Sequence, residues 1–334
     1  MGRLRICGFG LNMTPVCLGS TLPSLPGLLM RLIFAAALAC LAASASAGLP
    51  QVSSGRIERI EAMPSAFLPA RNIDVWLPPD YPRQAPYAVI YMHDGQMLFD
   101  PFETWNHQEW RADEVAAEVI RSGRTRPFII VGVWNDPAAR ISEYFPQKAL
   151  KALSPAQLEA LYALKRGEEP FFSRPVDSDN YLRFLVEELK PRIDRTYAVD
   201  GARESTVIMG SSMGGLISMY ALSEYPQVFG AAACLSTHWP GTVSPGDFSV
   251  AEAFFGYVDE QFPPPGPHRI YFDHGSETLD QHYAKLQQEI DRRLHARGYA
   301  FPRMLSLSFP GTDHSEQAWG ARLHVPMQFL LPPK

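Results

Sequence analysis

Short runs of apolar residues recur along the chain, and they constrain the possible folds more than any other feature of the sequence. A run that is apolar on both sides suits a strand covered on both faces, as in parallel sheets whose crossover helices pack above and below. The segments between the runs place apolar residues three and four positions apart, as amphipathic helices do. The sequence therefore predicts an α/β protein with a mostly parallel, doubly wound sheet of about eight strands and helices on both faces. The expected strands are 56–61, 72–77, 87–92, 128–134, 206–209, 231–235, 269–272 and 304–309, and the expected helices are 110–120, 180–193, 213–222 and 283–294.

The chain has 334 residues, of which 46% are hydrophobic, so it can bury a large core. We expect a single domain over residues 48–334, since α/β folds of this size often form one unit. Residues 136–180 depart from the alternation, because several prolines surround a weak helical stretch at 155–165. A connection of this length is typical of a lid or binding loop inserted into the domain. Cys234 lies in an apolar run, which predicts a buried structural thiol.

The net charge of −5 argues against a nucleic-acid partner, since the phosphate backbone requires a basic surface.

The N-terminal 47 residues have the pattern of an export signal: Met30 and a following arginine precede an apolar run at 32–41 and small residues at 45–47. The run is too short to span a bilayer, so we expect cleavage, no stable membrane span, and a periplasmic or secreted protein. Met30 is the expected initiator. Lipidation at Cys40 is an alternative that the cleavage-site pattern disfavours.

A G-x-S-x-G pattern centred on Ser212 is the first motif with chemical meaning. A strand signal at 206–209 leads into the pattern and a helix signal at 213–222 leads out of it. This arrangement is typical of a nucleophile elbow, in which a serine on a tight turn projects its hydroxyl above the sheet edge. The glycines at 210 and 214 let neighbouring backbone pack closely around that turn. Ser212 is therefore the predicted nucleophile.

A serine hydroxyl needs a general base to react at neutral pH. In folds with this elbow the order along the chain is serine, acid, histidine, so the base should lie after Ser212. Among the candidates, His314 follows the last strand signal directly, in a loop expected at the same sheet edge. His314 is therefore the predicted base.

The acid that would orient this histidine has three candidates after the strand at 269–272. Asp280 and Glu277 both lie beyond the turn at Gly275, and Asp273 ends the strand. Position favours Asp280, then Glu277, and then Asp273. Asp280 has a competing interpretation as the N-terminal cap of the following helix.

Two backbone N–H groups should stabilise the oxyanion. One belongs to Met213, the residue after the nucleophile, and the other to a loop that follows the third strand. In that loop, His93-Asp94-Gly95-Gln96, we expect the donor to be Gln96, with Gly95 allowing the turn and His93 bracing the loop.

Together these segments resemble the putative-esterase branch of the α/β-hydrolases, which includes enterochelin-esterase-like, esterase-D-like and feruloyl-esterase-like proteins. The resemblance rests on the loop at 93–96, the motif at 210–215 and the Asp313-His314 pair before Trp319. It implies the α/β-hydrolase fold and ester hydrolysis through an acyl-enzyme on the serine. Many members carry Gly-x-x-Asp at the acid, whereas here Thr278 stands three residues after the glycine, so the resemblance leaves the acid open.

The expected substrate is a small-molecule or saccharide-linked ester, with no cofactor and no metal. An acyltransferase on the same site, or a catalytically inert exported binding protein, are the alternatives. A metal hydrolase is disfavoured, since the three adjacent His and Asp pairs, at 93–94, 273–274 and 313–314, lack helical metal-ligand spacing. Residues that could shape a substrate pocket, or equally brace loops, are Trp105, Asn106, Trp110, Thr237, His238 and Trp239.

Overall fold

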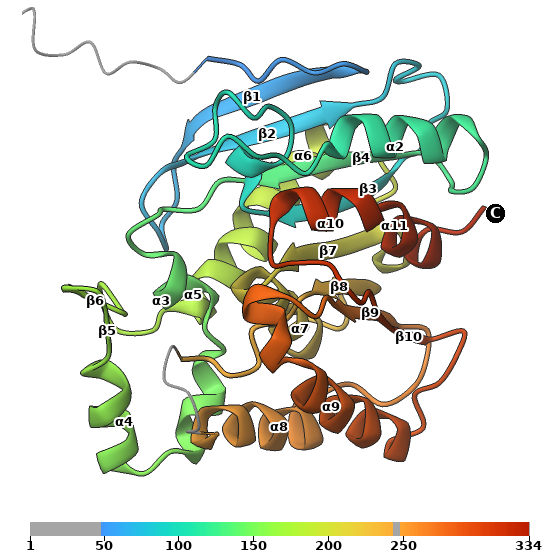
Figure 1. Ribbon diagram of the computed structural model, residues 1–334. Coiled ribbons are helices and arrows are strands. Elements are labelled where there is room, and N and C mark those ends of the chain that lie inside the picture. Colours follow the sequence, from blue (N-terminus) through green and yellow to red (C-terminus); the bar gives the residue numbers. More distant parts are fainter. Residues whose placement is uncertain (1–47, 243–247, 334) are drawn as a thin grey trace, which may run out of the picture. The chain divides into compact units, whose positions relative to one another are not determined.

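The eight predicted strands form one sheet in the computed structural model, which describes residues 48–242 and 248–333 (Figure 1). Their spatial order is β1-β2-β4-β3-β7-β8-β9-β10. Five neighbouring pairs, from β4 to β10, are parallel, and β2 pairs antiparallel with both β1 and β4. The prediction of a mostly parallel sheet of about eight strands is confirmed. The strands are β1 (Arg56–Met63), β2 (Arg71–Leu77), β3 (Ala88–His93), β4 (Phe128–Val133), β7 (Thr206–Ser211), β8 (Ala231–Leu235), β9 (Arg269–His274) and β10 (Met304–Ser308).

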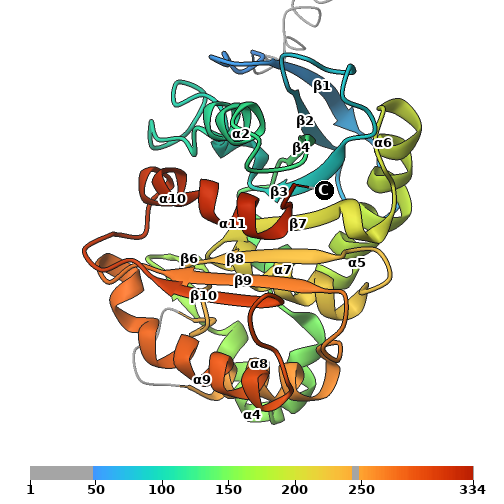
Figure 2. The ribbon, with the colours of Figure 1, turned by 90° about the vertical axis from the view of Figure 1, so that its right-hand side faces the viewer.

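Each face of the sheet carries its own buried core, which is why the central strands are apolar on both sides. Figures 1 and 2 show α2, α10 and α11 over one face, and α7, α8 and α9 on the other. Along β7, Val207 packs into one core and Ile208 into the other. Successive side chains of a strand point to opposite faces of the sheet, so a strand with a core on each side is apolar at every position. The helices are α2 (Ala112–Arg121), α3 (Arg140–Tyr144), α4 (Pro155–Tyr162), α5 (Ser178–Arg183), α6 (Lys190–Thr196), α7 (Met213–Glu224), α8 (Ser249–Gln261), α9 (Ala284–Ala296), α10 (Glu316–Arg322) and α11 (His324–Leu330).

Helix α8 is the long helix that the apolar spacing did not predict. Its buried residues include Val250, Phe254, Phe255 and Val258, which lie on one face of the helix, whereas Glu252, Asp259 and Glu260 are exposed. Helix α8 therefore has the apolar stripe of an amphipathic helix, although it was not among the helices expected from the sequence. The predicted helix at 180–193 is one continuous segment in which a π-helical stretch, η3 (Phe184–Leu189), joins α5 to α6.

Residues 136–180 hold the short elements α3, η2 (Gln147–Ala152) and α4, and a two-stranded hairpin of β5 (Lys165–Arg166) and β6 (Glu169–Pro170). Figure 1 shows α4 and the hairpin at one end of the strands, outside the eight-stranded sheet.

The whole of Gly48–Lys334 forms one compact unit. The predicted export signal, with Met30 and Cys40, lies outside the described residues. Cys234 is a fully buried free thiol. Within the described ranges, no helix has both the length and the apolar character needed to cross a membrane.

Candidate active site

Ser212 stands at the junction of β7 and α7, with backbone angles φ 58° and ψ −120°. A positive φ is costly for a residue with a side chain, and such strain is typical of functional sites. The turn is possible because Gly210 has no Cβ: one built there would lie 2.9 Å from the backbone of Gly214 and 2.9 Å from the ring of His93. Glycine is therefore required at position 210, because the strand and the helix approach each other too closely for a side chain.

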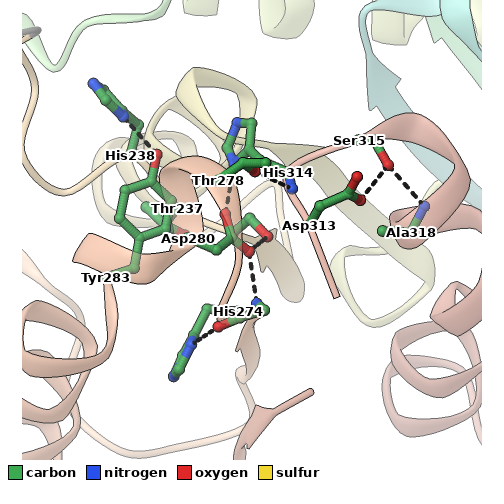
Figure 3. A network of polar contacts seen from close by, with 12 residues as sticks. Thr237, His238, His274, Thr278, Asp280, Tyr283, Asp313, His314, Ser315 and Ala318 are labelled. Atoms are coloured by element: carbon green, nitrogen blue, oxygen red, sulfur yellow. Dashed lines mark hydrogen bonds and ion pairs between the residues drawn. The ribbon is translucent and has the colours of Figure 1, made fainter. Parts of the chain in front are cut away.

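His314 and Asp280 meet although they are 34 positions apart. His314 Nδ1 lies 2.6 Å from Asp280 Oδ1 (Figure 3). A carboxylate only accepts hydrogen bonds, so Nδ1 is the donor, and the lone pair of a neutral ring is left on Nε2. A ring held in this tautomer can accept the proton of a hydroxyl group at Nε2.

The Asp280 carboxylate is fully buried, and both of its oxygens accept hydrogen bonds. Its Oδ2 accepts from the Ser236 hydroxyl and from the Gly275 N–H, both at 2.6 Å. Burial by itself would raise the pKa of Asp280, but the bonds from His314 and Ser236 outweigh it and lower that pKa below its ordinary value. The side chain caps no helix, because α9 begins after Tyr283 without a side-chain cap.

The two alternative acids are engaged elsewhere. Asp273 is fully buried and its two oxygens lie 3.0 and 3.1 Å from the Arg322 guanidinium. Glu277 is exposed and accepts from the Ser276 hydroxyl at 3.0 Å. Neither side chain has a hydrogen bond or ion pair with His314 among the described residues.

The loop that carries Asp280 and the loop that carries His314 are tied together by backbone contacts. The N–H groups of Ser276 and Glu277 both donate to the carbonyl of Thr312 at 3.0 Å. A Cβ at Gly275 would lie 2.2 Å from that same carbonyl, so only glycine permits the approach. His314 N in turn donates to the Thr278 hydroxyl at 2.9 Å. These bonds limit how far the imidazole and the carboxylate can separate.

The predicted oxyanion loop follows β3 as a single 3₁₀ turn, η1 (Gly95–Met97). Its conformation depends on Asp94, which is in the left-handed region (φ 57°) and binds Arg140 through two contacts of 2.7 Å. The Gln96 side chain accepts from Asn135 N at 3.1 Å. Outside their own helices, neither the N–H of Gln96 nor that of Met213 donates to the backbone of another described residue. Both N–H groups lie in the first turn of a helix, where backbone donors lack a partner within the helix.

His93 lies underneath this loop and takes no part in the contacts around His314. It is 2% exposed, and its Nδ1 lies 2.8 Å from the Tyr181 hydroxyl. Burial lowers the pKa of His93 to about 3, so the ring is neutral and acts as a packing group under the loop.

The residues considered for a substrate pocket divide into buried and exposed groups. Trp110 packs against Trp319, and Trp239 is fully buried, so both belong to the core. Trp105 is 82% exposed, and the neighbouring Asn106 donates to Glu316 at 2.8 Å, close in sequence to His314. The aromatic loop at 101–109 therefore contacts the start of α10.

Sequence reasoning missed Tyr283, which bridges Ser212 and His314. The Ser212 side chain is near enough to the Tyr283 hydroxyl to lower the pKa of the phenol, and the Tyr283 ring meets the His314 ring edge-on with centroids 5.7 Å apart. Tyr283 is 1% exposed and three residues beyond Asp280. In the sequence, only its position three residues after Asp280 pointed to a place near the site. A tyrosine that merely packs in the core could occupy the same position.

In the described part of the chain, one group of acidic side chains has the spacing of metal ligands, formed by Glu109, Asp113 and Glu114. A cavity of about 770 Å³ beside α2 is lined by Glu109 and Glu114 but not by Ser212 or His314. Burial and the neighbouring carboxylates raise the pKa of Glu109 to about 7. This cluster is thus distinct from the residues around Ser212.

The sheet order, the helices on both faces and the strand–serine–helix turn define the α/β-hydrolase fold. The chain belongs to the family described as "Putative esterase", which matches residues 66–330, and ester hydrolysis is accordingly its class of reaction. The resemblance stated from the sequence is confirmed at this level.

Two proteins of Bacillus subtilis (strain 168) are similar in sequence. YbbA, an uncharacterized protein, is 23% identical over 237 residues, which are 69% of this chain and 80% of YbbA. The ferri-bacillibactin esterase BesA is 26% identical over 170 residues, 50% of this chain and 54% of BesA. Among solved structures, a ferulic acid esterase from Anaeromyces mucronatus in complex with ferulic acid has a TM-score of 0.56 at 19% identity, covering 84% of this chain and 92% of its own. That likeness concerns the fold.

Proposed function

We propose that this chain is an exported serine esterase that hydrolyses a carboxylic ester through an acyl-enzyme on Ser212, with His314 as general base and Asp280 as the orienting acid. The observation that carries the proposal is the 2.6 Å contact between His314 Nδ1 and the buried Asp280 carboxylate, at the sheet edge where Ser212 stands in a strained turn. Tyr283 contacts both Ser212 and His314, which supports their closeness.

The chemistry follows from these positions. Ser212 Oγ attacks the ester carbonyl while its proton passes to His314 Nε2, and the N–H groups of Met213 and Gln96 bind the resulting oxyanion. The tetrahedral intermediate collapses when the protonated imidazole gives its proton to the leaving alcohol. Asp280 keeps Nδ1 protonated throughout and stabilises the imidazolium. Water then attacks the acyl carbon by the same sequence and frees Ser212.

The substrate class is a small-molecule or saccharide-linked ester. BesA is named as a ferri-bacillibactin esterase and the structural neighbour was solved with ferulic acid, so esters of hydroxylated aromatic acids are the first to test. The exposed Trp105, on the loop that contacts α10, could stack on such a ring. We assign residues 136–180 to an inserted lid over this site. The panel for the test contains acetyl, feruloyl, catecholate-siderophore and long-chain esters.

The test of the mechanism is Ser212→Ala, with 4-nitrophenyl acetate as substrate and a fluorophosphonate probe as label. We expect the substitution to abolish turnover and labelling while the folded protein and its thermal transition are retained. Turnover at the rate of the unsubstituted enzyme in Ser212→Ala would exclude Ser212 as nucleophile. An intact chain that neither turns over nor reacts with the probe would favour the inert binding protein.

Export is a separate part of the proposal, and it depends on the sequence pattern at 30–47. The mature protein is expected to begin at Gly48 and to be found outside the cytoplasm. N-terminal sequencing of the protein from its native compartment tests this, and a mature chain that begins at lipidated Cys40 would show that the alternative is correct.

A further inference from the structure

The hydroxyl of Tyr283 has two neighbours, Ser212 and His238. Tyr283 Oη lies 2.7 Å from His238 Nδ1 (Figure 3), and the two rings pack edge to face with centroids 5.8 Å apart. His238 is itself positioned by the elbow, since its N–H donates to the carbonyl of Ser212 at 3.2 Å. Both side chains are more than nine-tenths buried, so water does not compete for these bonds in the resting protein.

The direction of the hydrogen bonds can be worked out from the state of His238. Burial and the nearby His314 lower the pKa of His238 to about 4, so its ring is neutral and has one N–H. A hydrogen bond to the backbone of Thr242 favours that N–H on the other ring nitrogen, which leaves Nδ1 as the acceptor. The Tyr283 hydroxyl therefore donates to His238.

Tyr283 also stays protonated, because burial and the charge of Asp280 raise the pKa of its phenol well above the ordinary value. Its one proton is committed to His238, so toward Ser212 the oxygen presents only lone pairs. In the resting protein the Ser212 hydroxyl can fill one of them. Once Ser212 is acylated it has no proton to donate, and the Tyr283 oxygen is left as an unused acceptor beside the acyl group.

We propose that in the acyl-enzyme the Tyr283 oxygen binds the second hydrogen of the attacking water, and that this contact favours hydrolysis over acyl transfer. The inference rests on the proposed acyl-enzyme at Ser212. Water has two hydrogens: one passes to His314 Nε2 and the other is held by Tyr283. An alcohol has a single hydroxyl hydrogen, which His314 takes, so it makes no use of the second acceptor.

The step balances without a further reactant. The water oxygen forms a bond to the acyl carbon while His314 takes one proton, and the carbonyl electrons move to the oxyanion. On collapse the bond between the acyl carbon and Ser212 Oγ breaks, and His314 returns the proton to Oγ. The hydrogen held by Tyr283 leaves on the carboxylic acid product. His238 does not touch the reacting atoms and is a positioning residue that orients the Tyr283 hydroxyl.

The experiment compares Tyr283→Phe with the unsubstituted enzyme in 4-nitrophenyl acetate and methanol, and measures the ratio of methyl acetate to acetic acid. The ratio is decided after the acyl-enzyme has formed, so it does not depend on the folded fraction or on the rate of acylation. We expect it to rise about fivefold to tenfold, the effect of one lost hydrogen bond. The control is Tyr299→Phe, which removes another buried hydroxyl, bonded to the Pro263 carbonyl at 3.0 Å, and should leave the ratio unchanged.

A second measurement is needed if the enzyme transfers so little acetyl to methanol that methyl acetate cannot be detected. The acetyl adduct on Ser212 is followed by mass spectrometry in water alone, and its decay should be about tenfold slower in Tyr283→Phe. If the adduct forms and both its decay and the product ratio are unchanged, the role of Tyr283 is excluded. If no adduct forms on the unsubstituted enzyme, the proposed function itself fails, so the two failures are distinguishable.

The role of His238 is tested by two substitutions. His238→Gln keeps an acceptor for the phenol, and His238→Leu removes it. We expect the product ratio to stay close to that of the unsubstituted enzyme in the first and to rise toward that of Tyr283→Phe in the second. Equal ratios in the two variants would show that His238 only packs against the ring.

Discussion

Asp280 Oδ1 lies 2.6 Å from His314 Nδ1, and the second oxygen of the same carboxylate is held by the hydroxyl of Ser236 and the N–H of Gly275. The carboxylate is therefore fixed at both oxygens before any substrate arrives. An imidazole oriented in this way needs no rearrangement before Nε2 accepts a proton, as the proposed role of His314 requires.

Asp280→Asn should lower kcat for 4-nitrophenyl acetate by about 10²- to 10⁴-fold, because the amide can donate to Nδ1 and so favours the wrong tautomer of His314. Glu277→Gln is the matched control, since Glu277 is exposed and has no bond to the ring, and it should retain full activity. Steady-state kinetics on both variants measures the difference. A large loss of kcat in Glu277→Gln, with full activity in Asp280→Asn, would identify Glu277 as the acid instead.

Gly210→Ala should abolish activity and destabilise the fold, since the new methyl group would lie 2.9 Å from the backbone of Gly214. Overpacking of this kind costs about 1–3 kcal/mol. Gly256→Ala, inside α8, meets no atom within 4 Å and should instead stabilise the protein by up to about 1 kcal/mol. Urea unfolding of the two variants tests the contrast, and equal destabilisation by both would contradict it.

Arg322→Leu should lower the free energy of unfolding by about 3–5 kcal/mol, because it leaves the buried Asp273 carboxylate without its cation, with only neutral donors such as the Tyr271 hydroxyl. Arg292→Leu removes an ion pair at the protein surface and should have little effect. Chemical denaturation at pH 7 compares them. A loss for Arg322→Leu no larger than for Arg292→Leu would mean that the buried pair contributes nothing.

Glu109→Gln should stabilise the protein at pH 8 and have little effect at pH 4. Burial, together with the charges of Glu114 and Asp113, raises the pKa of Glu109 to about 7. The folded chain then holds a proton that the unfolded chain releases, so its stability falls as the pH rises from about 4.5 to about 7. Allowing for solvent screening, the gain at pH 8 is about 1–2 kcal/mol. Thermal unfolding at both pH values measures it, and a gain that persists unchanged at pH 4 would contradict the electrostatic origin.

The sequence by itself determined most of the sheet, because the signals for a strand buried on both faces are local. All eight expected strands are present, with ends displaced by a few residues at most. The strand–serine–helix turn around Ser212 could be predicted for the same reason, since the whole unit spans fewer than twenty residues. Helix α8 was not among the expected helices, although its buried residues follow the spacing of one helix face.

Only the tertiary structure decided which carboxylate contacts His314. Asp273, Glu277 and Asp280 lie within eight positions of one another, and local sequence ranks them only by distance from a turn. The close contact of Gly275 with Thr312 turns the chain so that Asp280 is buried beneath His314 while Glu277 faces solvent. The contact of Tyr283 with His238 and Ser212 likewise joins three loops that no sequence period relates. Such contacts depend on how separate strand ends meet at one edge of the sheet, and that information is not local in the chain.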